Sequence, residues 1–261
     1  YDQSGVVRDM VQNHLLQLLT MVAMEPPSRM DVDTLGNHKV DVLRAIRRWN
    51  PEEKTLNTAL GQYRGYHDEN GVAPGSDTPT YTELRLFVDN WRWHGVPFYL
   101  RSGKAMAAKV SEIIIQFRRP PHGIFGLRPG QELTSNTLSI CLEPDEGAHL
   151  QFEAKTPGEG MSMRSVDMEF HYQSSFRDQA IPEAYERLLQ DTLEGDSSLF
   201  IRSDHIEEAW RIVDPLLDYW QDAHPPAPHR YEPGSWGPRE ADTLLAESGH
   251  EWLQVCGGHG E

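Results

Sequence analysis

The first hydrophobic pattern along the chain covers Val6 to Ala23, where apolar residues recur every three to four positions. This spacing predicts an amphipathic helix with one buried stripe, and Pro26-Pro27 ends it. A second helical pattern covers residues 39–49 and directs Leu43 and Ile46 inward. Together these patterns predict two helices in the N-terminal part of the chain.

In the middle of the chain the hydrophobic period changes to two. Polar and aliphatic residues alternate over residues 82–89, which is typical of a β-strand, after a Gly-, Pro- and Asp-rich stretch interpreted as a loop over 61–79. Similar short runs follow over residues 96–101, 112–117, 138–142, 150–154 and 166–172. Because no helical pattern separates these runs, antiparallel connections are expected.

Helical patterns return in the last third of the chain. One runs from Pro182 to Gly195, one begins at Ser203, and a short one covers Pro238 to Ser248. The predicted class is therefore α+β, a large and mostly antiparallel sheet with helices packed on one face. The Pro-rich residues 224–228 are interpreted as a connector inside one domain that spans residues 1–261.

Composition narrows the function classes. The chain has 40 acidic and 24 basic residues and a formal net charge of -16, which would repel a phosphate backbone, so no nucleic-acid partner is expected. No run of about 18 apolar residues occurs, so no membrane segment is expected either. A small anionic substrate stays possible, because a few local cations outweigh a distant field that salt screens within about 10 Å.

The cysteine content is low. Cys141 and Cys256 are far apart and of unlike context, which favours a reducing compartment without disulfides and predicts a cytoplasmic protein. The segment Cys256-Gly257-Gly258-His259 lacks a second ligand pair, so we interpret it as a flexible tail and expect no metal site. No Gly-x-Gly-x-x-Gly or Gly-x-x-x-x-Gly-Lys-Ser/Thr motif is present, so the chain is expected to hold no dinucleotide by itself.

Polar residues interrupt the apolar stripe of the first helix. His14 is predicted on this stripe, directed toward the interior or a cleft at its margin, with Asp9 and Asn13 on adjoining surface. For such a histidine, a structural role with a hydrogen bond to one neighbour is the more frequent one. Asp9 lies near the start of the helix, where the helix dipole stabilises a carboxylate, and this alone can explain its presence. The alternative is that the imidazole accepts a proton from a hydroxyl near neutral pH.

Two cations follow the predicted strand that begins near Val96. Lys104 comes directly after Ser102-Gly103, a small pair that allows a bend, and Lys109 lies five residues on. Both ammonium groups are suited to an anionic or polyhydroxyl ligand, and the alternative is a solvated strand end.

Taken together, these segments resemble the C-terminal domain of the glucose-6-phosphate dehydrogenase family. The segments that carry the resemblance are residues 1–17 and 23–27, then Gly61-Gln-Tyr, Gly95-Val-Pro-Phe, Leu100-Arg-Ser-Gly-Lys, Glu183-Ala-Tyr-Glu-Arg-Leu, Trp210-Arg-Ile and Gly237-Pro-Arg-Glu-Ala-Asp. They occur in the family's order and cover nearly the whole chain. Tyr1 falls inside a family motif, so we expect an excised domain.

The resemblance implies the chemistry of the site. His14 becomes the general base that takes the proton of the anomeric hydroxyl of glucose 6-phosphate while NADP accepts hydride. Asp9 would accept hydrogen bonds from sugar hydroxyls, and Lys104 and Lys109 would contact the substrate. The product would be 6-phosphogluconolactone, formed in the oxidative pentose phosphate pathway, and a homodimer or homotetramer paired through the sheet is implied.

The sequence departs from the family at two places. Where the family has Arg-x-Gln-Pro, this chain has Cys141-Leu142-Glu143-Pro144, so Glu143 places a carboxylate at a substrate-facing amide position. A structural NADP site of animal members asks for Arg, Tyr, Lys and Arg, where this chain has Cys141, His149, Gln151 and Trp236. We therefore expect that structural NADP site to be absent.

Two readings of the function stay open. The chain lacks the family's dinucleotide-binding domain and its Asp-His-Tyr-Leu-Gly-Lys segment, so the domain alone is expected to be inactive. The alternative to the enzyme is a non-catalytic homologue that acts as a binding or assembly module. The presence of His14, Asp9 and Lys104 favours the enzyme.

Overall fold

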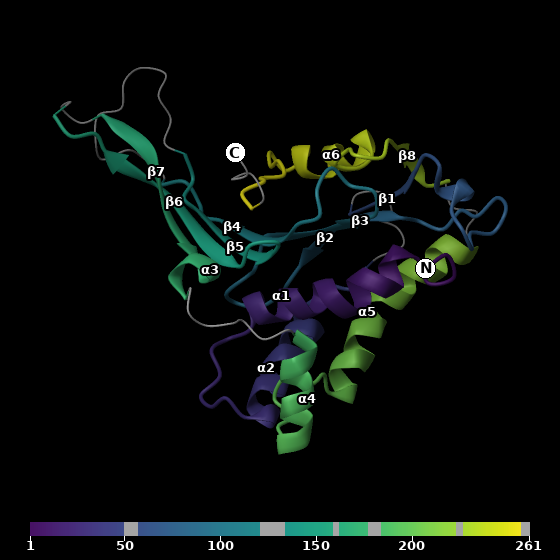
Figure 1. Cartoon of the computed structure of the whole chain (residues 1–261), viewed down its shortest axis with the longest axis horizontal. Coiled ribbons are helices and arrows are strands. Elements are labelled where there is room, and N and C mark those ends of the chain that lie inside the picture. Colours follow the sequence, from purple (N-terminus) through teal and green to yellow (C-terminus); the bar gives the residue numbers. More distant parts are fainter. Residues whose placement is uncertain (50–56, 121–133, 159–161, 177–183, 223–226, 257–261) are drawn as a thin grey trace. The chain divides into compact units, whose positions relative to one another are not determined.

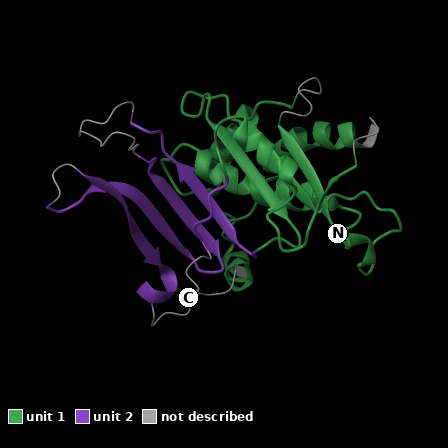
Figure 2. Ribbon diagram, turned by 90° about the horizontal axis from the view of Figure 1, so that it is seen from above, with its two compact units in different colours: residues 1–107, 182–251 green, residues 108–181, 252–261 purple. Residues whose placement is uncertain are grey.

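The computed structural model describes residues 1–49, 57–120, 134–158, 162–176, 184–222 and 227–256. The chain divides into two compact units, unit 1 with residues 1–107 and 182–251 and unit 2 with residues 108–181 and 252–261 (Figure 2). Within the described residues the strands form two four-stranded sheets, one in each unit, where the sequence predicted one large sheet. The α+β class is confirmed.

The sheet of unit 1 has the strand order β3-β2-β1-β8. Its strands are β1 (Thr58–Tyr63), β2 (Tyr81–Phe87), β3 (Pro97–Gly103) and β8 (His229–Tyr231). The pairs β1/β2 and β2/β3 are antiparallel, whereas β8 adds parallel to β1. The predicted loop over 61–79 therefore begins inside a strand. Gly61 is well suited to its position in that strand, because a Cβ there would lie only 3.1 Å from both Pro238 and Tyr231.

Helices cover both faces of this sheet. The helices of unit 1 are the π-helix η1 (Val7–Leu15), α1 (Leu16–Ala23), α2 (Val32–Ala45), the short 3-10 helix η3 (Tyr66–Asp68), α4 (Ala184–Glu194), α5 (Ser203–Asp222) and α6 (Arg239–Ala246). Helix α2 packs against α1 and α5, and α5 packs against η1 (Figure 1). Helix α6 lies on the opposite face, where Ala241 packs with Ala59 and Tyr81. The sequence predicted helices on one face of the sheet only, whereas this sheet has helices on both.

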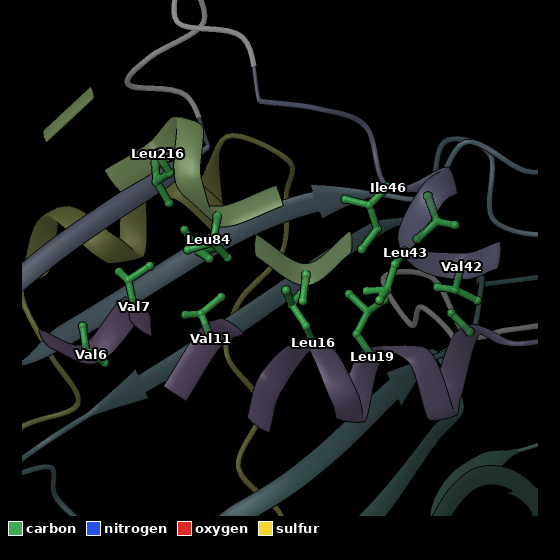
Figure 3. Packing of buried hydrophobic residues seen from close by; sticks show 14 residues of the cluster. Val6, Val7, Val11, Leu16, Leu19, Val42, Leu43, Ile46, Leu84 and Leu216 are labelled. Carbon is green, nitrogen blue, oxygen red and sulfur yellow. The ribbon is translucent and has the colours of Figure 1, made fainter. Parts of the chain in front are cut away.

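The main core of unit 1 lies under η1 and α1. Val7, Val11, Leu16 and Leu19 extend from one side of these helices toward Leu84 and toward residues of α2 (Figure 3). Leu16 and Val11 have no exposed surface, and Leu43 and Ile46 are buried as the sequence predicted. Burial of these side chains fixes the rotation of η1 about its axis.

Helix α2 begins earlier and ends earlier than predicted. The carboxylate of Asp31 accepts hydrogen bonds from the backbone N–H and the hydroxyl of Thr34, both at 2.9 Å, and so caps the first turn. The helix ends at Ala45, and Ile46 instead bridges to Val88. The cap was readable in the sequence as Asp followed three positions later by Thr.

Unit 2 is built on an antiparallel sheet of order β4-β5-β6-β7. Its strands are β4 (Ser111–Gln116), β5 (Thr137–Glu143), β6 (Gly147–Lys155) and β7 (Met163–His171), followed by the short helix α3 (Tyr172–Ser175). All four strands were predicted. β5 and β6 extend beyond the predicted ranges at both ends, whereas β4 and β7 begin earlier than predicted and also end one residue earlier. The register places Ile115, Leu138, Leu150 and Met168 side by side on one face. The other face carries mostly polar residues.

Unit 2 also contains a disulfide that the sequence analysis did not expect. Cys141 on β5 is bonded to Cys256, with the Cα atoms 5.7 Å apart. The backbone N–H of Cys256 also donates to Glu112 Oε2 on β4 at 3.0 Å. The prediction of unpaired cysteines is therefore wrong, because the folded chain brings two residues together that are 115 positions apart in the sequence. Cys256 itself is not part of a flexible tail, contrary to the prediction. Residues 257–261 lie outside the described part.

Candidate functional site

The segment that carries Asp9 and His14 is a π-helix rather than the predicted α-helix. It spans Val7–Leu15, and the backbone N–H of Leu16 bonds to the carbonyl of Val11, five residues earlier. Such helices are rare and are frequently found at functional sites. Val7 and Val11 are buried, whereas Asp9 and His14 are exposed. His14 therefore lies on the outer face, not on the buried stripe where it was predicted.

The wider turn changes which residues are neighbours. In an α-helix, five residues at about 100° each would place Asp9 and His14 about 140° apart around the axis. In a π-helix, hydrogen bonds join residues five apart, so these two side chains lie about one turn apart on one side. The local backbone thus brings together the two residues that the sequence analysis selected.

Lys104 occupies a fixed position at the end of β3. Its backbone N–H donates to Thr80 O at 2.9 Å, and its carbonyl accepts from the hydroxyl of Tyr231 at 2.7 Å. Its ammonium lies 4.8 Å from the centre of the Tyr1 ring, a cation-π contact. Because the backbone is held on both sides, only the side chain of Lys104 is free to reorient.

Tyr1 connects Lys104 to the π-helix. Burial of its hydroxyl raises the pKa of Tyr1, and the negative charge of Asp9 raises that pKa further. Asp9 is therefore electrostatically coupled to the ring that Lys104 contacts. Through Tyr1, the carboxylate of Asp9 on η1 and the ammonium group of Lys104 after β3 thus act on one phenol ring.

The bend that directs Lys104 is not the predicted Ser102-Gly103 pair. Both residues belong to β3 and pair with Thr82 and Tyr81. Gly103 is needed there because a Cβ would lie 2.6 Å from Met106 Sδ. The turn comes one residue after Lys104, where Ala105 has a φ of 50°, a left-handed conformation that non-glycine residues seldom adopt.

Lys109 and Glu143 lie in unit 2 and form an ion pair. Lys109 Nζ is 2.6 Å from Glu143 Oε1. The Lys109 side chain is 87% exposed and that of Glu143 is 47% exposed. The carboxylate that replaces the family's amide is therefore neutralised by the adjacent lysine, and both predicted substrate contacts belong to one ion pair.

The four positions that correspond to the structural NADP site of animal family members hold no lysine or arginine in this chain. Cys141 is consumed by the disulfide, and His149 is buried. The ring of Trp236 is covered by the guanidinium of Arg101, 5.1 Å from the ring centre. Gln151 is exposed on β6. The absence of that nucleotide site stays a prediction, and the protein chemistry at these positions offers no dedicated phosphate ligand.

Cavities in unit 1 lie apart from these side chains. One cavity measures about 370 Å³ and is lined by residues 2–8, Pro79 and Trp220, among others. The second measures about 210 Å³ and lies against Val11, Arg47 and Leu84. Neither of these two cavities is lined by Asp9, His14 or Lys104. Among the described helices, none has the length and apolarity needed to cross a membrane.

Comparison with known proteins agrees with the sequence resemblance. A family model described as "Glucose-6-phosphate dehydrogenase, C-terminal domain" matches residues 1–253. A glucose-6-phosphate 1-dehydrogenase of Aggregatibacter actinomycetemcomitans is 43% identical over 98% of this chain and 53% of its own length. Another from Mycolicibacterium smegmatis is 43% identical over 97% of this chain and 52% of its own.

Solved structures agree in fold. The crystal structure of a glucose-6-phosphate 1-dehydrogenase from Mycobacterium avium has a TM-score of 0.81 and 42% identity, covering 97% of this chain and 52% of its own. A glucose-6-phosphate dehydrogenase in complex with its substrate glucose-6-phosphate has a TM-score of 0.86 and 34% identity, with the same coverage. The chain thus spans about half the length of the relatives it matches.

Proposed function

Because this chain belongs to the glucose-6-phosphate dehydrogenase C-terminal domain family, we propose that it supplies the substrate-binding half of an enzyme that oxidises glucose 6-phosphate. The observation that carries this proposal is the π-helix, which exposes His14 and Asp9 about one turn apart on one face. The reaction would yield 6-phosphogluconolactone and serve the oxidative pentose phosphate pathway.

In this proposal His14 is the general base. The proton of the C1 hydroxyl passes to a ring nitrogen of His14 as the C1–H bond breaks and the C1–O bond becomes the lactone carbonyl. A histidine is suited to this step because its ordinary pKa lies close to neutral pH. Exposure of the ring leaves it accessible to a substrate that approaches the outer face of η1.

Asp9 and Lys104 orient the sugar in the proposed complex. Asp9 accepts hydrogen bonds from sugar hydroxyls, since an ionised carboxylate is an acceptor only. The ammonium group of Lys104 would donate a hydrogen bond to a substrate oxygen, and this bond would replace its contact with the Tyr1 ring. The backbone of Lys104 is held in place by its own hydrogen bonds. The predicted contacts of Lys109 and Glu143 with the substrate stay predictions.

A bound NADP would supply the hydride acceptor for this reaction. The described residues do not fit a dinucleotide, because their sheets are mostly antiparallel and the sequence has no Gly-x-Gly-x-x-Gly turn. We therefore assign to this chain the proton transfer and the orientation of the sugar, and assign the dinucleotide to residues outside it. The cytoplasmic location stays a prediction, and unpaired cysteines no longer support it, because Cys141 and Cys256 form a disulfide.

The test is the substitution His14→Asn in the full-length protein. We expect kcat to fall about 10² to 10⁴-fold, the usual contribution of a general base, with a much smaller change in KM. His94→Asn is the matched control, since His94 is exposed and belongs to the turn between β2 and β3 rather than to η1. A near-normal kcat for His14→Asn would refute the general-base role of His14. Wild-type full-length protein without any glucose-6-phosphate dehydrogenase activity would instead favour the non-catalytic binding or assembly module.

We further propose that the chain forms a homodimer or homotetramer through the sheet of unit 2. The apolar face of this sheet carries Met168 and Phe170, whose side chains are 61% and 39% exposed. Their cross-strand neighbours on this face are also apolar: Leu150, Ala148, Leu138 and Ile140. A continuous apolar surface on a sheet face is typical of a subunit interface.

A matched pair of substitutions on β7 tests this interface. Met168→Lys places a charge on the apolar face, whereas Asp167→Lys places the same charge on the opposite, polar face. Sedimentation analysis should show a smaller species for Met168→Lys and the wild-type species for Asp167→Lys. An unchanged assembly in both variants would exclude this face.

A further inference from the structure

A group of metal-ligating side chains lies on the polar face of the unit 2 sheet. His149 on β6 is paired directly opposite Glu169 on β7. His171, two residues after Glu169, projects from the same face and lies opposite Gly147, which has no side chain. The space beside Gly147 allows the two imidazoles to approach, with ring centres 5.1 Å apart and planes at 88°.

The nitrogen and oxygen atoms of this group converge. His149 Nδ1 is 3.8 Å from Glu169 Oε1, and His171 Nε2 is 3.7 Å from Glu169 Oε2. One ligand atom from each of the three residues lies within 4.8 Å of the others. These two separations are longer than hydrogen bonds. They are close to the spacing of about 3.4 Å between ligands of a tetrahedral ion with bonds of about 2.1 Å.

The carboxylate of Asp145 fixes one of the imidazoles. Asp145 Oδ2 lies 2.8 Å from His171 Nδ1, which favours a proton on that nitrogen. The other nitrogen, Nε2, then keeps its lone pair and faces Glu169. Carboxylates that hold the far nitrogen of a metal-bound histidine in this way are a regular feature of metal sites.

A buried hydroxyl gives a second, independent observation. Ser139 on β5 is paired directly opposite His149, so its side chain lies on the same face. The residue is 1% exposed, and its Oγ has no hydrogen-bond partner among the described residues. Burying a hydroxyl without a partner costs free energy, and a metal-bound water would supply that partner.

We propose that His149, Glu169 and His171 bind a divalent transition-metal ion of the zinc class. Two imidazoles and one carboxylate are the ligand types that such ions prefer, and the fourth position would hold a water beside Ser139. The ion would join β6 to β7 and stabilise this part of the sheet. The inference does not rest on the proposed dehydrogenase function, and it replaces the expectation that the chain has no metal site.

The test is a titration of the full chain with ZnCl₂ by isothermal calorimetry, without thiol reductant so that Cys141 and Cys256 contribute no thiolate. We expect one ion per chain with a dissociation constant of about 1 µM or lower. Glu169→Gln should abolish this binding. Asp167→Asn removes the same charge from the same face of β7 and should leave it unchanged. Asp145→Asn should weaken it about 10- to 100-fold.

The melting temperature, measured with and without Zn²⁺, distinguishes a variant that has lost the ion from a variant that has failed to fold. Zn²⁺ should raise the melting temperature of the wild-type chain and of Asp167→Asn, because an ion that binds only the folded state stabilises it. It should not raise that of Glu169→Gln. The proposal is overturned if wild-type protein shows no saturable binding and no thermal shift, or if Glu169→Gln and His171→Asn bind as tightly as wild type.

Discussion

The ion pair between Lys109 and Glu143 gives a prediction for substrate affinity. The perturbation is Glu143→Gln, which restores the amide expected from the family and leaves Lys109 without its partner at 2.6 Å. Both side chains are largely exposed, so losing the pair should change the free energy of unfolding by at most about 1 kcal/mol. A change in KM would therefore report on substrate binding rather than on a loss of folded protein.

The magnitude follows from the length of the ion pair. A phosphate held about 3 Å from the Lys109 ammonium would lie roughly 6 Å from the Glu143 carboxylate. At this distance in water, a dianion and a carboxylate repel by about 1.4 kcal/mol without salt, and by about half of that at physiological ionic strength. Removing the carboxylate should then lower KM about three- to tenfold, with the larger effect at low salt.

The assay is initial-rate kinetics of the full-length protein at two salt concentrations. Glu146→Gln is the matched control, because it removes an exposed carboxylate three residues along the chain. Lys109→Met should raise KM, since it removes the cation and leaves Glu143 unpaired. An unchanged or higher KM in Glu143→Gln would refute the reasoning and place the phosphate away from this pair.

Three further predictions concern stability. Leu16→Ala, at a fully buried side chain, should lower the free energy of unfolding by about 2–5 kcal/mol in a urea titration, whereas Met21→Ala on the same helix, 47% exposed, should change it far less. Cys256→Ser should lower the melting temperature, since the disulfide closes a separation of 115 residues and such crosslinks stabilise by about 2–5 kcal/mol, and a reductant should lower it in wild type alone. Hydrogen bonds from Ser76 and Ala73 lower the pKa of Asp2 from 3.8 to about 2, so its contribution is present above pH 4 and is lost as the pH falls toward 2. Asp2→Asn should therefore be less stable than wild type at pH 7, and this difference should shrink between pH 4 and pH 2.

Local patterns predicted the elements that bury one face. The alternation over 82–89 and the spacing from Val6 to Ala23 both predicted real elements, because burial of one face requires those periods. The π-helical hydrogen bonds were not predictable, since α- and π-helices bury similar residues over a single turn or two. The three-residue strand β8 was missed because it is too short to show a period.

The candidate site was predictable only in its residue types. Asp9, His14 and Lys104 were selected from polar residues in apolar surroundings and from the family resemblance. Their neighbours were not, because the contact of Lys104 with Tyr1 and the pair of Lys109 with Glu143 depend on the folded backbone. The same holds for His149 and His171, which strand register alone brings together.

The central claim is that the outer face of the π-helix presents His14 to the reacting carbon of the sugar. A crystal structure of the full-length protein with bound glucose 6-phosphate tests it most directly. The account predicts a ring nitrogen of His14 within about 2.6–3.2 Å of the C1 hydroxyl oxygen, with Asp9 contacting a sugar hydroxyl. A sugar bound with C1 more than about 6 Å from that ring, beyond the reach of one bridging water, would contradict it.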